Sequence, residues 1–436
     1  AGIERAKKQA CPEIKAAAGK AMYPLSFAQK RLYALHQLAK DSTSYNMPAA
    51  LELRGNLNRN RLKKAFTTLI NRHEALRTSF VLHNGEAMQH IGSHAEGNWT
   101  ELEIESESKL NETMQSFVKP FDLQEAPLIR ASLASLDSDR HYLLLDMHHI
   151  IADGVSISTL MQEFADIYSG KDLQPLTLQY KDFAVWQHEQ FSRGELSRQK
   201  DYWLKALEGE LPVLDLPLDK QRPLLPDFSG DTFAAQIDRD TVAKLRHVME
   251  ETGTTLYMIL LAGFSIFHSK LSDKEDISVG SPAAGRGRAE LEGVIGMFVN
   301  TLAMRSKPEG DKTFREYLDE VRAITLAAVD HQDFPFEEIA RHLDSRREVN
   351  RNPIFDAMLV LQNSDDFKME LPGLTLSSHK LPHQISKFDL TLHAEEQADG
   401  TIRCVFEYST ALFEKATIAR WADHFRELLG NIGTHV

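Results

Sequence analysis

The segment Met147-His148-His149-Ile150-Ile151-Ala152-Asp153-Gly154-Val155-Ser156 joins a short apolar run to a helical pattern. Residues 142–147 are almost continuously apolar, which is typical of a strand buried on both faces. After Gly154 apolar residues recur at helical spacing, and Gly170 follows them as a stop. Polar groups on a loop that leaves a buried strand lie where folds commonly place functional residues.

The two histidines and the aspartate leave three interpretations open. If the strand continues through His148 and His149, their side chains point to opposite faces, and only one can face a given cavity. First, both could be core residues, with Asp153 capping the following helix. Second, the three could bind a metal ion, which is disfavoured because neighbouring histidines diverge. Third, one histidine could act as a base or position a substrate, with Asp153 ordering the loop and Gly154 offering an unshielded N–H.

Outward from this segment, the pattern predicts irregularly ordered helices and strands. Helices are expected after the N-cap Ser26 and over 62–72, 240–251, 257–269, 313–329 and 416–429, and strands over 49–53, 77–82, 128–136, 276–280, 355–362 and 402–408. Because helices and strands do not alternate strictly, the sequence favours an α+β fold over a doubly wound sheet.

A proline-rich stretch divides the chain. Residues 211–230 hold four prolines, too many for a helix or a central strand. We interpret the stretch as an extended crossover between two lobes. The expected organisation is an N-terminal linker over 1–22, an N-terminal lobe over 23–185, a crossover region over 186–230 and a C-terminal lobe over 231–436.

Composition excludes several classes of protein. The 436 residues are 42% hydrophobic and 26% charged, and they hold two cysteines, Cys11 and Cys404. This excludes a disulfide framework, and the run of apolar residues needed to span a membrane is missing. A net charge of −13 argues against a nucleic-acid binder. We expect a cytoplasmic protein, and the start without Met suggests a piece of a longer polypeptide.

Seven segments together resemble the condensation domain of non-ribosomal peptide synthetases. The segment over 147–156 matches the HHxxxDG signature of that family. The others, in the family's order, are SFAQKRLY (26–33), RHEALRTSF (72–80), YKDFAVW (180–186), IGMFVNT (295–301), HQDFPFE (331–337) and RNP (351–353). One HxxxD motif would be a weak signal, whereas this ordered set is specific.

The resemblance implies two lobes similar to chloramphenicol acetyltransferase, forming a V-shaped pseudo-dimer with a central tunnel. It implies peptide-bond formation between a donor aminoacyl or peptidyl thioester and the amino group of an acceptor thioester. Both substrates arrive on 4′-phosphopantetheine arms of carrier proteins, beside an adenylation domain. The domain itself is expected to bind no cofactor, nucleic acid or membrane, and to be monomeric when excised.

The resemblance also assigns roles to residues. His149 faces the tunnel as the catalytic histidine, and Gly154 donates its N–H near the forming oxyanion. His148 is structural, and Asp153 is expected to pair with Arg72 and hold the loop in shape. The tunnel-lining residues it suggests are Ser26, Trp203 and Asn352.

The subtype and the alternatives follow from the same segments. The DGVS and LSFAQKRLY stretches look like the class that joins an L-donor to an L-acceptor, and the two histidines disfavour a heterocyclisation domain. An epimerisation domain is the nearest alternative. A coenzyme A-dependent acyltransferase and a non-catalytic carrier-protein recruitment platform are the other two. The run Gly285-Arg286-Gly287-Arg288 is expected to be a solvated loop, with contact to an acidic carrier protein or a phosphopantetheine phosphate as the alternative.

Overall fold

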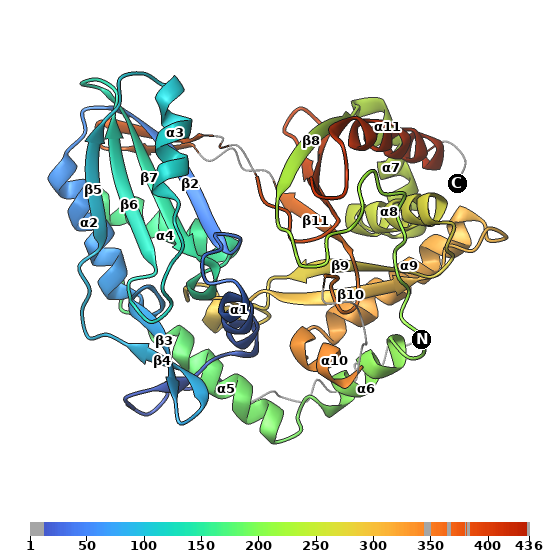
Figure 1. Ribbon diagram of the computed structural model, residues 1–436, viewed down its shortest axis with the longest axis horizontal. Helices are drawn as coiled ribbons and strands as arrows, with labels where there is room; N and C mark the ends of the chain where they lie inside the picture. The colour runs from blue at the N-terminus through green and yellow to red at the C-terminus, as the bar shows by residue number, and fades with distance from the viewer. Residues whose placement is uncertain (1–12, 344–349, 364–367, 380, 382–383, 434–436) are drawn as a thin grey trace. The chain divides into compact units, whose positions relative to one another are not determined.

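Two compact units make up the chain (Figure 1). The computed structural model describes residues 13–343, 350–363, 368–379, 381 and 384–433, so Cys11 and the first twelve residues of the expected linker lie outside the described part. Unit 1 comprises Ala1–Glu195, Arg286–Phe298 and Met369–Leu376; unit 2 comprises Leu196–Gly285, Val299–Lys368 and Ser377–Val436. The expected lobes are continuous stretches of chain, whereas two segments of the C-terminal half belong to unit 1.

Unit 1 is built on a six-stranded sheet with the strand order β12-β13-β2-β7-β6-β5 and a three-stranded sheet with the order β1-β4-β3. The β13 strand hydrogen-bonds to β2, which explains why a late segment of the chain belongs to this unit. The strands are β1 (Tyr23–Pro24), β2 (Asn46–Gly55), β3 (Thr78–His83), β4 (Glu86–Ile91), β5 (Asn98–Glu103), β6 (Ile129–Ser135), β7 (Arg140–His148), β12 (Lys368–Leu371) and β13 (Leu374–His379). The helices are α1 (Phe27–Leu38), α2 (Arg59–Arg72), α3 (Ser108–Phe117), α4 (Gly154–Tyr168) and α5 (Tyr180–Ser192), with 3-10 turns η1 (Glu74–Arg77), η2 (His149–Ile151) and η3 (Ala289–Leu291).

The β7 strand lies at the centre of the unit 1 sheet. It runs antiparallel to both β2 and β6, and every residue from His141 to His148 is buried. Its length and burial confirm the strand predicted from the apolar run. Because side chains alternate along a strand, Asp146 and His148 share one face of the sheet. The register places Arg130 of β6 opposite Asp146, and Asn46 of β2 opposite His148.

Unit 2 is built on a second six-stranded sheet with the order β10-β9-β11-β14-β15-β8. Its strands are β8 (Gly230–Ile237), β9 (Ile277–Ala283), β10 (Asn300–Ser306), β11 (Ala357–Asn363), β14 (Leu390–Glu396) and β15 (Ile402–Ser409). Its helices are α6 (Ser197–Ala206), α7 (Arg239–Thr252), α8 (Leu256–Ser272), α9 (Phe314–Asp330), α10 (Phe336–His342) and α11 (Lys415–Ile432). Cys404 of β15 is buried in this unit, and burial raises the pKa of its thiol to about 12.

A side chain next to its first turn explains where α1 begins. The hydroxyl of Ser26 accepts a hydrogen bond from the Gln29 N–H, and the Gln29 side chain accepts one from the Ser26 N–H, so α1 begins with a capping box. This confirms the predicted N-cap.

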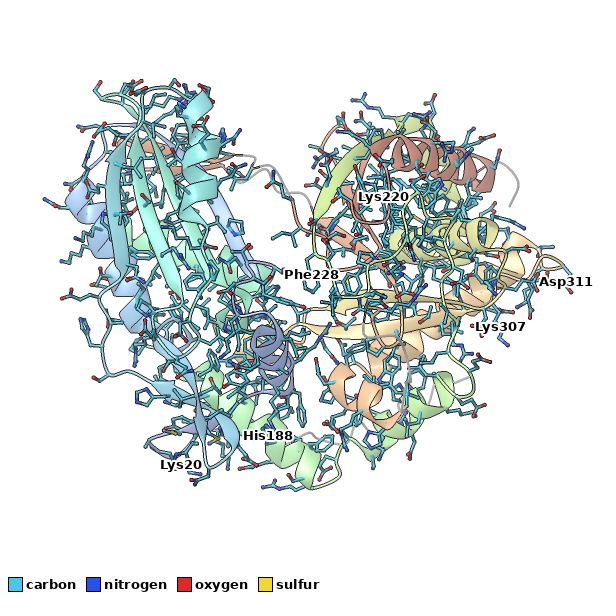
Figure 2. All side chains as sticks on the ribbon, in the orientation of Figure 1. Lys20, His188, Lys220, Phe228, Lys307 and Asp311 are labelled. Carbon is cyan, nitrogen blue, oxygen red and sulfur yellow. The ribbon has the colours of Figure 1, made fainter. Side chains whose placement is uncertain are left out.

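In unit 1, α5 also contacts α1: His188 (labelled in Figure 2) stacks on Phe27 with the ring centroids 4.9 Å apart.

The helices and strands predicted from the sequence are present, with ends that differ by a few residues. Residues 207–229 contain no helix or strand, as expected for the proline-rich stretch. Periodicity did not predict the short elements β4, β12 and α10, each of which spans no more than seven residues. The longer helices α3, α5 and α6 were also not predicted.

Among the described residues, no single helix combines the length and the apolar composition needed to cross a membrane. The α7 and α8 helices reach that composition only when they are taken together, and they meet at an angle of 107°.

Candidate active site

The HHxxxDG segment runs from the end of β7 through η2 to the start of α4. His148 is the last residue of β7, and the chain then turns through η2, so the strand does not continue through His149. The expected opposite-face arrangement therefore does not decide the direction of the two rings. Backbone hydrogen bonds fix each ring instead.

His148 is a buried, packed side chain. It is 3% exposed, and its Nδ1 accepts a hydrogen bond of 3.1 Å from the Ile150 N–H. Its ring meets those of His36 and Phe121 nearly edge-on, with centroid distances of 5.8 and 6.3 Å. These contacts are those of a structural residue.

His149 is only partly buried, and its ring is oriented by its own turn. Its Nδ1 lies 2.9 Å from the carbonyl oxygen of Ala152. A carbonyl oxygen can only accept, so Nδ1 carries the proton, and in the neutral ring the lone pair is on Nε2. The backbone N–H of His149 donates to the carbonyl oxygen of Tyr45 at 2.8 Å, which ties the turn to the chain before β2. The arrangement prepares Nε2 to accept a proton or a hydrogen bond.

Asp153 is fully buried and is the N-cap of α4. Its Oδ1 accepts from the Ser156 N–H at 2.8 Å, from the Ser156 hydroxyl at 2.7 Å and from Arg286 Nη2 at 3.0 Å. Its Oδ2 accepts from the Phe298 N–H at 3.0 Å. The predicted pair between Asp153 and Arg72 is therefore wrong, because Arg286 occupies that position.

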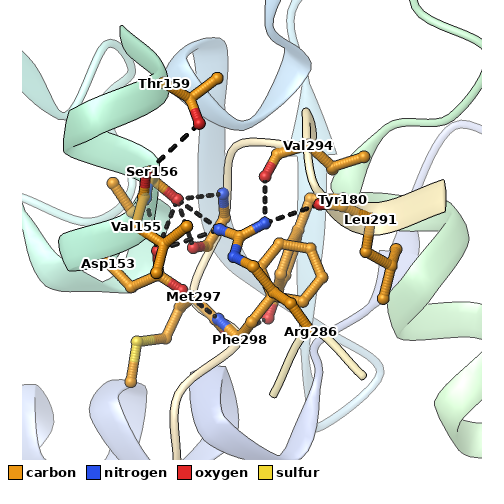
Figure 3. A network of polar contacts seen from close by, with 12 residues as sticks. Asp153, Val155, Ser156, Thr159, Tyr180, Arg286, Leu291, Val294, Met297 and Phe298 are labelled. Atoms are coloured by element: carbon orange, nitrogen blue, oxygen red, sulfur yellow. Dashed lines mark hydrogen bonds and ion pairs between the residues drawn. The ribbon is translucent and has the colours of Figure 1, made fainter. Parts of the chain in front are cut away.

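Arg286 is the centre of the network in Figure 3. Its side chain is 6% exposed, so the prediction of a solvated loop at this residue is also wrong. Nη1 donates to the carbonyl oxygens of Leu291 at 2.8 Å and Val294 at 2.6 Å, and the guanidinium lies 4.0 Å from the centroid of the Phe298 ring. Arg286 thus folds the segment Arg286–Phe298 on itself and attaches it to the N-terminus of α4.

Two further side chains hold the same segment. The Ser156 hydroxyl lies 3.0 Å from the Gly296 carbonyl oxygen, and the Gly296 N–H donates back to it at 3.1 Å. The Tyr180 hydroxyl donates to the Met297 carbonyl oxygen and lies 2.7 Å from the Ser26 hydroxyl. A Cβ added to Gly296 would lie 1.8 Å from the Tyr180 ring, so this position requires glycine.

Arg72 belongs to a different ion-pair cluster of unit 1. Its Nε lies 2.9 Å from Glu163 Oε2, and Nη2 donates to Oε1 at 3.2 Å. His73 Nε2 lies 2.6 Å from the same Oε2, and these partners keep the pKa of Glu163 low in spite of its burial. The RHEALRTSF segment thus joins α2 to α4. Arg72 therefore pairs with Glu163 and not, as predicted, with Asp153.

Gly154 is the first residue of α4 and is exposed. A Cβ built on it would meet no atom of the described residues within 4 Å. Its N–H belongs to the first turn of a helix, where amide groups lack an intrahelical partner and form the positive end of the helix dipole. Neither packing nor a left-handed backbone conformation requires a glycine here, and the role of its N–H stays a prediction.

Two of the suggested tunnel-lining residues are buried packing residues. Ser26 is 0% exposed, caps α1 and contacts Tyr180, so it does not line an open passage. Trp203 is 1% exposed, and its indole N–H donates to the His331 carbonyl oxygen at 2.8 Å within unit 2. Asn352 is half-buried, with its amide 3.4 Å from the Lys387 carbonyl oxygen, and its role stays a prediction.

The metal interpretation lacks a ligand set. In the part of the chain that the structure describes, no three His, Cys, Asp or Glu side chains come together in a way that could hold a metal ion. Both Asp153 oxygens are already occupied by donors, and the Nδ1 atoms of His148 and His149 are bound to backbone groups.

Sequence reasoning missed Arg286, Ser156 and Tyr180 as members of the site. Ser156 and Tyr180 lie inside segments that resemble the family, so their positions were available although their partners were not. Arg286 lies 133 residues after Asp153, and its glycine neighbours resemble those of a surface loop. A signal that could have identified it is the need of a buried aspartate for a cation.

Comparison with known proteins shows the family of the chain. The family model "Condensation domain" matches residues 20–436. One of the plipastatin synthase polypeptides of Bacillus subtilis is 61% identical over 426 residues, which are 98% of this chain and 17% of that protein. Bacitracin synthase 3 of Bacillus licheniformis is 46% identical over 98% of this chain and 7% of its own length. The chain thus spans a small fraction of these relatives.

Solved structures share the fold. The X-domain from teicoplanin biosynthesis, determined in complex with OxyB, superimposes with a TM-score of 0.90 at 26% identity, over 97% of this chain and 95% of that one. A four-domain nonribosomal peptide synthetase bound to AMP and glycine gives a TM-score of 0.88 at 21% identity, over 98% of this chain and 34% of that one. The match over residues 20–436 and the related synthetases show that the chain belongs to the condensation-domain family of non-ribosomal peptide synthetases, whose members form amide bonds.

Proposed function

We propose that this domain forms a peptide bond between a donor aminoacyl or peptidyl thioester and the amino group of an acceptor aminoacyl thioester. Both substrates would be carried on 4′-phosphopantetheine arms of carrier proteins. The C–S bond of the donor breaks as the new C–N bond forms, and the donor arm leaves as a thiol. The observation that carries the proposal is the orientation of His149, whose Nδ1 is bound to the Ala152 carbonyl oxygen so that Nε2 is the basic nitrogen.

Alignment supplies most of the catalysis in this proposal. Aminolysis of a thioester is downhill, and holding two tethered substrates in reacting geometry can contribute about 7–11 kcal/mol to the lowering of the barrier. His149 Nε2 accepts the amine proton or hydrogen-bonds the amine as it attacks. A positioned base adds about 10²–10⁴-fold to the rate.

The position of Gly154 also supports the proposal. Its N–H is at the N-terminus of α4, where developing negative charge is favoured. No acceptor among the described residues is paired with this N–H, and a Cβ at this position would meet open space. We assign it to the oxyanion of the tetrahedral intermediate.

The partners are proposed from the relatives. Plipastatin and bacitracin synthases are much longer than this chain, and a solved structure with the same fold has four domains. We therefore propose donor and acceptor carrier proteins and an adjacent adenylation domain as partners. An L-donor and an L-acceptor as substrates, and a cytoplasmic location, are proposed from the sequence alone.

The test is a condensation assay with both carrier proteins loaded. Replacing His149 by Ala should lower dipeptide formation by about 10²–10⁴-fold. His83→Ala, at an exposed histidine of β3, is the matched control and should keep full activity. Near-normal turnover by His149→Ala would contradict the catalytic assignment. Running the assay with D- and L-donors tests the subtype, and epimerised donor without dipeptide would indicate an epimerisation domain.

A second function is favoured by one observation. The solved X-domain that matches with a TM-score of 0.90 was determined as a complex with OxyB, so this fold can serve as a binding platform. Tight carrier binding by a wild-type protein that forms no dipeptide would support this function. Dipeptide formation from free coenzyme A thioesters would instead support the acyltransferase alternative.

A further inference from the structure

We propose that Gln29 is a positioning residue for His149, acting through the η2 turn; the inference rests on the proposed function. Gln29 lies in the first turn of α1 and is 1% exposed. Its Nε2 donates to the carbonyl oxygen of Ile150 at 3.2 Å, in the middle of η2. Ile150 is the residue that follows His149, so Gln29 holds the turn on which the catalytic ring is mounted.

The oxygen and the nitrogen of the Gln29 side-chain amide bind different partners. Its Oε1 accepts from the Ser26 N–H at 3.0 Å and completes the capping box of α1. Its Nε2 reaches outside the helix, to Ile150 and, at 3.5 Å, to Gln89 Oε1. The helix start needs only the oxygen, and a glutamate would serve it equally well. The amide nitrogen is what links α1 to the turn.

The turn in question determines which nitrogen of His149 is basic. Ala152 lies directly after η2, and its carbonyl oxygen accepts the Nδ1 proton of His149. Displacing the turn would weaken this hydrogen bond and allow the proton to move to Nε2, the nitrogen that must accept in the reaction. A 1 Å misplacement of a reacting group can cost about 10²-fold in rate.

The contact belongs to a network that surrounds the turn. Ser26, the N-cap of α1, also contacts the Tyr180 hydroxyl, which donates to Met297. The next residue, Phe298, donates its N–H to Asp153 on the other side of the turn. The start of α1 therefore supports η2 directly through Gln29 and supports the cap of α4 through Tyr180.

The experiment compares Gln29→Met with Gln179→Met. Gln179 is a matched control because its Oε1 accepts from the Glu74 N–H at 3.0 Å and its Nε2 donates to the Arg72 carbonyl oxygen at 3.1 Å, away from η2. Both variants lose two hydrogen bonds to backbone groups and should melt at a lower temperature. Only Gln29→Met should lower kcat of dipeptide formation, by about 10–100-fold, with KM for the loaded carriers unchanged.

A readout independent of activity is the ¹⁵N spectrum of the histidine side chains. The His149 signals are assigned by their loss in His149→Ala. In the wild type and in Gln179→Met they should report the Nδ1-protonated form, and in Gln29→Met a mixture of the two tautomers. Unchanged His149 signals and unchanged kcat in a folded Gln29→Met would overturn the inference.

A second variant keeps the inference testable if Gln29→Met does not fold. Gln29→Glu preserves the capping box but removes the donor to Ile150, so at neutral pH it should show the same loss of kcat. Protonation of the introduced, buried carboxyl at lower pH restores a donor, and activity relative to the wild type at the same pH should then rise. A ratio that is flat with pH would contradict the inference. If the wild type forms no dipeptide, the proposed function fails, whereas the histidine spectra still test the role of Gln29.

Discussion

Two buried carboxylates flank the histidine pair and differ in the donors that reach them. Asp146 and Asp153 are both 0% exposed. Asp153 accepts four hydrogen bonds that involve both oxygens, one of them from Arg286. Asp146 Oδ2 accepts from Asn46 Nδ2 at 2.8 Å and lies 3.5 Å from Arg130 Nε, while its Oδ1 has no partner among the described residues. Burial alone therefore does not decide what a carboxylate does for the fold.

The difference is electrostatic as well as geometric. Burial raises the pKa of Asp146 to about 6, and the opposing effects of Arg130 and Asn46 are smaller. Asp153 instead contacts the guanidinium of Arg286, whose side chain is 6% exposed, and both of its oxygens accept hydrogen bonds. We infer that Asp153 holds the site together through its contact with Arg286, whereas the ionised form of Asp146 destabilises the folded state at neutral pH.

The largest effect is expected from removing the cation beside Asp153. Replacing Arg286 by Ala leaves a buried charge without its partner, which commonly costs about 3–5 kcal/mol, and it also releases the carbonyl groups of Leu291 and Val294. The free energy of unfolding from urea denaturation measures the loss. Arg288→Ala is the matched control, because Arg288 pairs with the partly exposed Glu290 and should lose about 1 kcal/mol or less. Equal losses in the two variants would contradict the role given to the buried pair.

Replacing Asp146 by Asn is expected to raise the free energy of unfolding, whereas Arg286→Ala lowers it. The folded-state pKa of Asp146 is about 6 and the ordinary value is 3.8. Protonation of Asp146 therefore adds its full contribution to the free energy of unfolding below about pH 4, and this contribution is lost as the pH rises through about 6. Asn imitates the protonated carboxyl. Asp146→Asn should therefore match the wild type near pH 4 and exceed its free energy of unfolding by on the order of 3 kcal/mol at pH 8.

Denaturant unfolding at a series of pH values measures this difference. The Asp153→Asn variant is the comparison, since it should be less stable than the wild type at neutral pH. If Asp146→Asn destabilises the protein at pH 8, the carboxylate contributes as an ion, and the contrast between the two aspartates is lost.

The local sequence was sufficient to predict the elements around Asp153 but not its ionic partner. The strand over 142–147, the helix after Gly154 and the capping role of Asp153 could be predicted because each depends on neighbours within a few residues. The ionic partner could not, because Arg72 and Arg286 are both remote from Asp153 in sequence and only the folded chain distinguishes them. The assignment of two late segments to unit 1 has the same origin, since it depends on the pairing of β13 with β2 and on the contacts of Arg286 and Phe298 with Asp153.

A smaller difference in the free energy of unfolding is expected between alanine variants of two buried serines. The Ser156 hydroxyl contacts Asp153, Arg286 and Gly296, and Ser156→Ala should cost about 1–3 kcal/mol because the Gly296 N–H loses its acceptor. Ser132 of β6 is also fully buried, but its hydroxyl has no partner among the described residues. Ser132→Ala should therefore change the free energy of unfolding by less than about 1 kcal/mol in either direction. Similar losses at both positions would indicate that hydroxyl burial, and not the Asp153 network, sets the cost.

The smallest effect on stability is expected at Gly154, directly after Asp153. The added Cβ of Gly154→Ala would meet no described atom within 4 Å, and alanine is about 1 kcal/mol better than glycine inside a helix. The free energy of unfolding should thus stay constant or rise slightly, while dipeptide formation falls at least about 10-fold because the methyl group occupies space beside the N–H. Gly296→Ala is the contrasting control: its Cβ would lie 1.8 Å from the Tyr180 ring, so it should lose stability and activity together. A stable Gly154→Ala with full activity would remove Gly154 from the site and leave Asp153 with a purely structural role.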